Sequence, residues 1–138
     1  MTLTRRYRFS ASHRLNSPKL SDTENDRVYG KCNNPFGHGH DYVLFVSVRG
    51  PLDAETGRIV DLDTLDSLVA RQVIEPFEHR NLNTEVEAFR ELVPTTENLA
   101  NEIRRRLQQE WKSAFNGAAT VLDRIRIEET KRNHIEIP

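Results

Sequence analysis

The chain has 138 residues with 20 basic and 21 acidic side chains, so its formal net charge is −1. A balance this close to zero argues against a dedicated nucleic-acid-binding protein, which carries a basic surplus. The sequence has no apolar run near the roughly 18 residues of a membrane span, and no apolar stretch typical of a secretory signal. Its length fits one domain over residues 1–138. The single cysteine, Cys32, excludes an internal disulfide and leads us to expect a cytoplasmic protein.

Two strands are predicted in the first third of the chain. Tyr7, Phe9 and Ala11 alternate with polar residues, and His13 continues the same apolar face because strand side chains repeat every two positions. A polar connection over residues 14–37 follows, and a connection of this length in a small domain is usually functional or disordered. The second strand is predicted at 38–49. It carries apolar residues on both faces, so both faces should be covered.

The rest of the chain predicts two helices and then two strands. Asp61 can cap a helix that ends near Pro76, and the motif Pro94-Thr95-Thr96-Glu97 opens a second helix. Strands are predicted at 121–130 and 134–137. The order is therefore ββααββ, an α+β fold in which two helices cover one face of a four-stranded sheet. The other face needs cover from elsewhere, which suggests self-association.

Three histidines are the clearest candidates for a chemical site. His38 and His40 lie two residues apart, so both imidazoles point the same way in an extended chain. If the first two strands pair as a hairpin, His13 lies beside them at the mouth of the long connection. Three nitrogen ligands with one position left open is the arrangement of a catalytic zinc. The alternative is a pair of ordinary loop histidines and a buried core histidine.

Two other side chains allow more than one interpretation. Cys32 precedes His38 by six residues and could be a fourth zinc ligand, a buried apolar side chain, or a thiolate acting as base or nucleophile near the metal. Glu129 shares the face of two isoleucines, where a carboxylate needs a partner. That partner is either a nearby arginine or a ligand with adjacent N–H donors.

Two polar motifs are weaker candidates. Glu78 and His79 could form an acid–imidazole couple that orients a proton-transfer group, although adjacent residues need not touch. The alternative is a solvated carboxylate beside a surface histidine. Thr95, Thr96 and Glu97 are explained by helix capping, with hydroxyl caps followed by an acid in the first turn.

Together these motifs resemble one family, the 6-pyruvoyltetrahydropterin synthases and their 6-carboxytetrahydropterin synthase relatives. The C-x5-H-G-H block is the most specific part of the resemblance. The matching blocks occur in family order over nearly the whole chain: Phe9-Ser10-Ala11-Ser12-His13, residues 30–40 (GKCNNPFGHGH), Glu78-His79-Arg80-Asn81-Leu82, Thr95-Thr96-Glu97-Asn98 and Glu129-Thr130.

The resemblance implies a tunnelling fold with a four-stranded antiparallel sheet. Three subunits would close a barrel, and two trimers would stack into a homohexamer with sites between subunits. It also implies that a Zn²⁺ ion is held by His13, His38 and His40. Cys32 matches the catalytic base of the family and His79 the histidine of its relay.

The resemblance further implies how a pterin would bind. Glu129 matches the glutamate that anchors the pterin ring, and Thr95, Thr96 and Glu97 match positions that line its pocket. One position departs from the family pattern, because Glu78 stands where the relay acid is usually aspartate. The carboxylate is retained on a stem one methylene longer.

The reaction implied is conversion of 7,8-dihydroneopterin triphosphate to 6-pyruvoyl-tetrahydropterin with elimination of triphosphate. The five residues between Cys32 and His38 favour this pyruvoyl branch over the carboxy branch of queuosine synthesis, which starts from the same substrate and usually has a shorter spacing. Neither a nucleic acid nor a membrane is expected as partner. The same residues would also suit a zinc hydrolase that makes no use of Glu129, or a non-catalytic zinc-stabilised oligomer whose coordination Cys32 closes.

Overall fold

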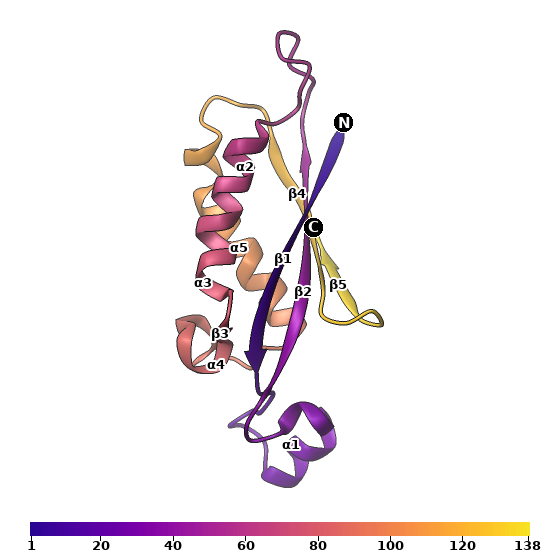
Figure 1. Ribbon diagram of the computed structural model, residues 1–138, viewed down its shortest axis with the longest axis vertical. Coiled ribbons are helices and arrows are strands. Elements are labelled where there is room, and N and C mark those ends of the chain that lie inside the picture. The colour runs from indigo at the N-terminus through magenta and orange to yellow at the C-terminus, as the bar shows by residue number, and fades with distance from the viewer.

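The first two strands pair along their whole length in the computed structural model, which describes residues 1–138. β1 (Thr2–His13) and β2 (His38–Arg49) run antiparallel, from Thr2 opposite Arg49 to His13 opposite His38. The pairing on which the expected meeting of the three histidines depends is therefore present, and the second strand has the predicted bounds. As a result, the end of β1 and the start of β2 meet at one end of the molecule (Figure 1).

The sheet has five strands in the order β3-β1-β2-β4-β5. β4 (Val121–Glu128) pairs antiparallel with β2, and β5 (His134–Ile137) with β4. The prediction of a four-stranded antiparallel sheet was wrong at the opposite edge, where β3 (Arg80–Asn81) runs parallel to β1. A strand of two residues is too short to show an alternation of apolar and polar side chains, so the sequence does not predict it. It forms because the backbone groups at the open edge of β1 need hydrogen-bond partners.

Two long helical segments lie against one face of the sheet (Figure 1). The first passes through α2 (Leu62–Val69), the π-helical turn η2 (Ala70–Ile74) and α3 (Glu75–Phe77), so it ends close to the predicted Pro76. The second is α5 (Thr96–Ala114). None of the helices is both long and apolar enough to cross a membrane.

Side-chain caps fix where these helices begin. The Asp61 carboxylate accepts a hydrogen bond from the Thr64 backbone N–H at 3.1 Å, as predicted for a cap. Thr95 is the cap of α5, and its hydroxyl accepts from the Asn98 backbone N–H at 3.2 Å. The start of α5 is thereby set one residue after the cap, at Thr96.

The connection over residues 14–37 contains structure that its polar composition did not predict. It forms α1 (Asp22–Tyr29) and a one-turn 3₁₀ helix, η1 (Gly30–Asn33), beyond the end of the sheet (Figure 1). Ser21 caps α1, and the buried Asn25 amide donates to the carbonyl oxygens of the preceding loop. Two further short elements, α4 (Leu82–Glu85) and η3 (Glu87–Phe89), precede α5.

The core lies between the helices and the facing side of the sheet. Phe9 of β1 stacks on Tyr42 of β2 with ring centroids 5.1 Å apart, and Leu65 and Ile103 from α2 and α5 are fully buried in the same cluster. This face continues directly into the histidines at the end of the hairpin, because the odd-numbered side chains of β1 share one side.

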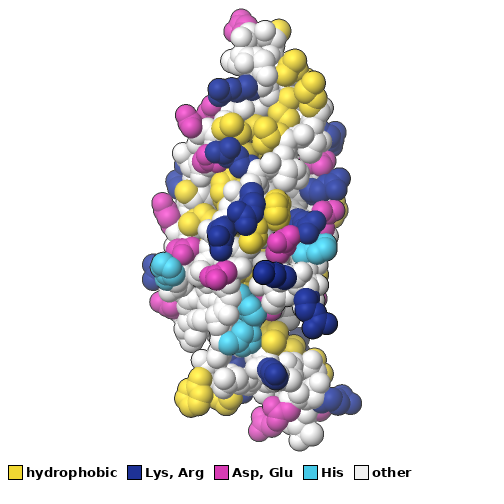
Figure 2. All heavy atoms as spheres, turned by 45° about the vertical axis from the view of Figure 1, so that its right-hand side comes forward, with side chains coloured by type: hydrophobic (Ala, Val, Ile, Leu, Met, Phe, Trp, Pro, Cys, Tyr) yellow, Lys and Arg dark blue, Asp and Glu magenta, His cyan; other side chains and the backbone are white.

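The opposite face of the sheet carries no helix. Phe45 of β2 is partly exposed there, and the Arg126 guanidinium lies 5.6 Å from its ring centroid. In Figure 2 the right-hand side of Figure 1 is turned toward the viewer, and arginine and lysine side chains lie there between hydrophobic and acidic ones. The strand β2 therefore has one fully covered face and one partly covered face within the single chain, where the sequence predicted cover on both.

Candidate active site

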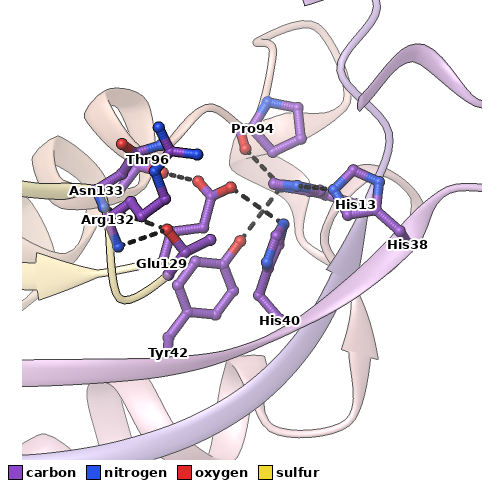
Figure 3. A network of polar contacts seen from close by, with 10 residues as sticks. His13, His38, His40, Tyr42, Pro94, Thr96, Glu129, Arg132 and Asn133 are labelled. Carbon is purple, nitrogen blue, oxygen red and sulfur yellow. Dashed lines mark hydrogen bonds and ion pairs between the residues drawn. The ribbon is translucent and has the colours of Figure 1, made fainter. Parts of the chain in front are cut away.

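The three histidines converge at the end of the hairpin, as the strand alternation predicted. Their ligand atoms all lie within 4.8 Å of one another, and no cysteine or carboxylate belongs to this cluster. His13 is fully buried, while His38 and His40 are partly exposed. His13 Nε2 and His38 Nε2 are 3.2 Å apart (Figure 3). Ligand nitrogens around a tetrahedral zinc are about 3.3 Å apart, so the distance in this pair is that of two ligands of one metal ion.

A backbone carbonyl selects the tautomer of His13. Its Nδ1 lies 3.0 Å from the Pro94 carbonyl oxygen, and the Tyr42 hydroxyl lies 3.3 Å from the same nitrogen (Figure 3). A carbonyl oxygen can only accept, so Nδ1 carries the proton and the lone pair of Nε2 points toward His38. Outer-shell hydrogen bonds of this kind orient the histidine ligands of metals. Sequence reasoning missed Pro94 and Tyr42, because a carbonyl and a core tyrosine carry no motif.

His40 adds a buried nitrogen that has no hydrogen-bond partner. The atom is Nε2, and its nearest charged neighbour is Glu129 Oε1 at 3.1 Å, close enough for an ion pair but outside hydrogen-bond geometry. An unsatisfied buried polar atom costs free energy unless something binds it. The residues present therefore fit a divalent metal with nitrogen ligands.

The protonation states of the histidines also suit metal binding. Burial lowers the pKa of His13 to about 4, against the opposing charge of Glu129. Burial also lowers the pKa of His40, and Glu129 again opposes it. His13 is thus neutral near pH 7, which is the form that ligates a metal.

Glu129 lies directly after β4, on the inward side where the sequence placed it. Its partners are His40 and the Thr96 hydroxyl, which donates to Oε2 (Figure 3). The nearby arginine considered as its partner does not take this role, since Arg126 of β4 pairs with Glu128 at 2.7 Å. Because Thr96 stands at the N-terminus of α5, the carboxylate also faces the positive end of a 19-residue helix.

Thr95 and Glu97 occupy different surroundings from Thr96. The Thr95 hydroxyl is engaged as the cap of α5, and the Glu97 side chain is exposed. Thr96 alone of the three forms a hydrogen bond with Glu129. Capping, which the sequence favoured for the whole motif, therefore explains Thr95 but leaves Thr96 as part of the polar cluster.

Cys32 lies in η1, partly buried, and stands outside the group of metal-binding atoms. Its backbone carbonyl accepts a hydrogen bond from the Leu15 N–H at 2.8 Å, two residues beyond His13. Burial raises the pKa of the thiol, and the Glu129 charge adds to this. A bound divalent cation opposes both effects, because it favours the thiolate.

Glu78 and His79 do touch, although adjacency alone did not require it. His79 Nε2 lies 2.9 Å from Glu78 Oε1, and the His79 side chain is 80% exposed. Both residues are fixed to Ser10 of β1: Glu78 Oε2 accepts from the Ser10 N–H at 3.2 Å, and the His79 N–H donates to the Ser10 carbonyl at 2.6 Å. His79 adopts φ +58°, a conformation rare for residues other than glycine.

His79 lines a pocket of about 290 Å³ together with β1 and β2 residues such as Ser12 and Asp41. Within this chain, neither Glu78 nor His79 forms a hydrogen bond or an ion pair with Cys32. The structure thus places Glu129 and Thr96 next to the three histidines, and it places His79 beside the hairpin with its ring open to solvent.

Comparison with known proteins gives a consistent result over the whole chain. A family model described as 6-pyruvoyl tetrahydropterin synthase matches residues 2–138. The chain is 44% identical over 132 residues to 6-pyruvoyl tetrahydrobiopterin synthase of Poecilia reticulata, covering 95% of this chain and 85% of that protein. It is 46% identical over 107 residues to the Homo sapiens protein of the same name, covering 78% and 74%.

A solved structure agrees with these sequence relatives. The 6-pyruvoyl tetrahydropterin synthase of Caenorhabditis elegans superposes with a TM-score of 0.89 at 42% identity, covering 99% of this chain and 94% of that chain. The Plasmodium falciparum synthase structure superposes with a TM-score of 0.63 at 16% identity, covering 99% and 96%, which shows the same fold.

The depressed pKa of His13 predicts how the metal-free protein responds to acid. The unfolded chain takes up a proton near pH 6.5 and the folded chain near pH 4, so the free energy of unfolding should fall between these values as pH decreases. In urea titrations with a chelator, the parent protein should lose about 2–3 kcal/mol more between pH 7 and pH 4.5 than the His13→Gln variant. Equal losses would contradict the assignment, as would an imidazole NMR titration that places the pKa of His13 near 6.5.

Proposed function

Since this chain belongs to the 6-pyruvoyl tetrahydropterin synthase family, we propose that it is a cytoplasmic, zinc-dependent enzyme that converts 7,8-dihydroneopterin triphosphate to 6-pyruvoyl-tetrahydropterin. Elimination of triphosphate makes the reaction a carbon–oxygen lyase reaction. Residues 1–138 are proposed to act as one synthase domain, which the family match over residues 2–138 supports. The observation that carries the proposal is the convergence of His13, His38 and His40 beside the inward carboxylate of Glu129.

The three histidines are proposed to hold the zinc through their ring nitrogens. When bound, zinc supplies Lewis-acid polarisation of oxygens on the substrate side chain. The Pro94 carbonyl keeps the His13 tautomer whose Nε2 has a lone pair to offer a metal, and the unpartnered His40 Nε2 supports the same role. A neutral His13 at pH 7 avoids competition between the proton and the metal.

Glu129 is proposed to anchor the pterin ring. Its two carboxylate oxygens can accept from the adjacent amino and ring N–H groups of a pterin, which is the type of ligand that an inward carboxylate needs. In the single chain those oxygens instead face Thr96 and His40. We assign Thr96 to the floor of the pterin pocket and keep Thr95 and Glu97 as residues of its rim.

Cys32 is proposed to act as the catalytic base that removes a proton from the substrate side chain. His79, oriented by Glu78, would protonate and deprotonate that thiol, so the relay uses glutamate in place of aspartate. The solvent-exposed His79 ring and the absence of a contact with Cys32 in one chain favour a relay completed by a neighbouring subunit. A homohexamer in which sheets join into a barrel would also cover the helix-free face of the sheet.

Product identification tests the proposed reaction. Purified protein incubated with 7,8-dihydroneopterin triphosphate should release triphosphate and a product with the mass of 6-pyruvoyl-tetrahydropterin. Cys32→Ala should retain zinc and lower turnover by about 10²–10⁴-fold, because it removes a proton-transfer group. A carboxylated pterin with released acetaldehyde would instead assign the carboxy branch. Turnover unchanged in Cys32→Ala would remove this residue from the mechanism.

Metal analysis tests the ligand set separately from activity. His38→Ala and His40→Ala should each lower the zinc content of the purified protein well below one ion per chain, because two nitrogen ligands hold zinc weakly. His134→Ala is the matched control, since His134 is an exposed histidine on β5, and it should bind zinc like the parent. Zinc lost from Cys32→Ala, or a thiol protected from reagents until the metal is stripped, would make Cys32 a fourth ligand.

A further inference from the structure

We infer that Asn33 is a positioning residue that holds Cys32 in place through the chain segment leaving His13. The inference rests on the proposed function, because the position of Cys32 affects catalysis only if its thiol takes part in the reaction. Asn33 belongs to η1, next to Cys32, and its side chain is turned inward with 7% of the residue exposed.

Hydrogen bonds from the Asn33 side chain and the Cys32 carbonyl to residues 15 and 16 form what we call the clamp. At its centre is Leu15, whose backbone N–H and C=O both take part in these bonds. The Leu15 N–H donates to the Cys32 carbonyl at 2.8 Å, and the Leu15 carbonyl accepts from the Asn33 side-chain amide at 2.8 Å. The same amide nitrogen donates to the Asn16 side-chain oxygen at 2.9 Å. The two hydrogens of the Asn33 side-chain amide are thus bonded to Leu15 and Asn16, which follow His13 by two and three positions.

The main chain of Asn33 contributes a further contact. Its carbonyl accepts a hydrogen bond from Arg14 Nε at 3.0 Å. The element that carries Cys32 and Asn33 is a single 3₁₀ turn without a side-chain cap, and the residues at 34–36 that follow it are exposed. Few internal contacts fix such a turn, so its position depends on the bonds to residues 14–16.

The segment that receives Cys32 is itself held from the other side. Asn83 of α4 accepts from the Arg14 N–H at 2.8 Å and donates to the Arg14 carbonyl at 2.9 Å. Two asparagine side chains therefore hold consecutive residues of the chain after His13: Asn83 binds the backbone of Arg14, and Asn33 binds the backbone of Leu15. This gives the turn with Cys32 a rigid support that starts at the histidine cluster.

The chemistry of the clamp requires an amide at position 33. Asn33 Nδ2 faces two oxygens, so replacement by a carboxylate would put a negative charge against two acceptors at nearly constant side-chain size. Replacement by alanine would leave the Leu15 carbonyl without its donor. Either change frees the turn and lets the thiol move, and a displacement of about 1 Å at a reacting group costs roughly 10²-fold in rate.

The experiment compares Asn33→Ala and Asn33→Asp with Asn34→Ala, a neighbouring exposed asparagine outside the clamp. For the two Asn33 variants we expect kcat to fall about 10- to 100-fold, with zinc content and KM within about twofold of the parent. Asn34→Ala should match the parent in all three. Alkylation of Cys32 by iodoacetamide in the zinc-loaded protein should be several-fold faster in the Asn33 variants, because the thiol is no longer held partly buried.

A double-mutant cycle separates positioning from general damage. In the Cys32→Ala background, Asn33→Ala should cause no further loss of turnover, because its effect acts through the thiol. An equal loss in both backgrounds would overturn the inference, and so would an unchanged alkylation rate. If Asn33→Ala does not fold, Asn16→Ala removes one of the two amide bonds and should give smaller changes in the same direction.

The alkylation arm also keeps this inference distinct from the proposed function. If the parent protein forms no pyruvoyl product, the proposed reaction is wrong. Faster alkylation in the Asn33 variants would then still support the clamp on Cys32, and unchanged alkylation would overturn it as well.

Discussion

The register between β1 and β2 is the constraint on which the rest of the site depends. His13 stands opposite His38, and His40 stands two residues further along the same face. Side chains alternate across a sheet, so a slip of one residue would turn one strand's histidines to the other side of the sheet. The register is secured by the buried face that continues from the core, where Phe9 and Tyr42 stack on each other and are both buried.

Burial of the histidines at the end of this face then sets their protonation states. Removing His13 and His40 from water lowers the pKa of both, while Glu129 limits the effect. The result is a group of imidazoles next to a carboxylate, in which the buried Nε2 of His40 has no hydrogen-bond partner, and such an atom costs free energy. A cation among the nitrogens and a ligand with N–H donors at Glu129 would compensate for both parts of that cost. The buried nitrogens and the buried carboxylate, which destabilise the isolated chain, are thus the groups that would bind the cation and the ligand.

The residues proposed to transfer protons lie on less regular parts of the chain. Cys32 lies on a single turn, and His79 lies in a strained loop conformation at the edge of β1. Each is fixed by hydrogen bonds to backbone groups of the chain near the end of β1: Cys32 through Leu15 and its neighbour Asn33, and His79 through Ser10. A rigid hairpin end therefore serves as a common support, in keeping with the general placement of functional loops on stable scaffolds.

The sequence by itself determined the elements whose signals are local. Alternation predicted the first two strands and the face that each histidine takes, and the cap candidates, Asp61 and the Thr95-Thr96 pair, marked where the long helices begin. Only the tertiary structure decided that Cys32 lies outside the ligand cluster, that a two-residue β3 joins the sheet, and that the Pro94 carbonyl orients His13. These features depend on contacts between distant segments, such as the 81 residues that separate Pro94 from His13, and periodicity or propensity within a short window carries no information about them.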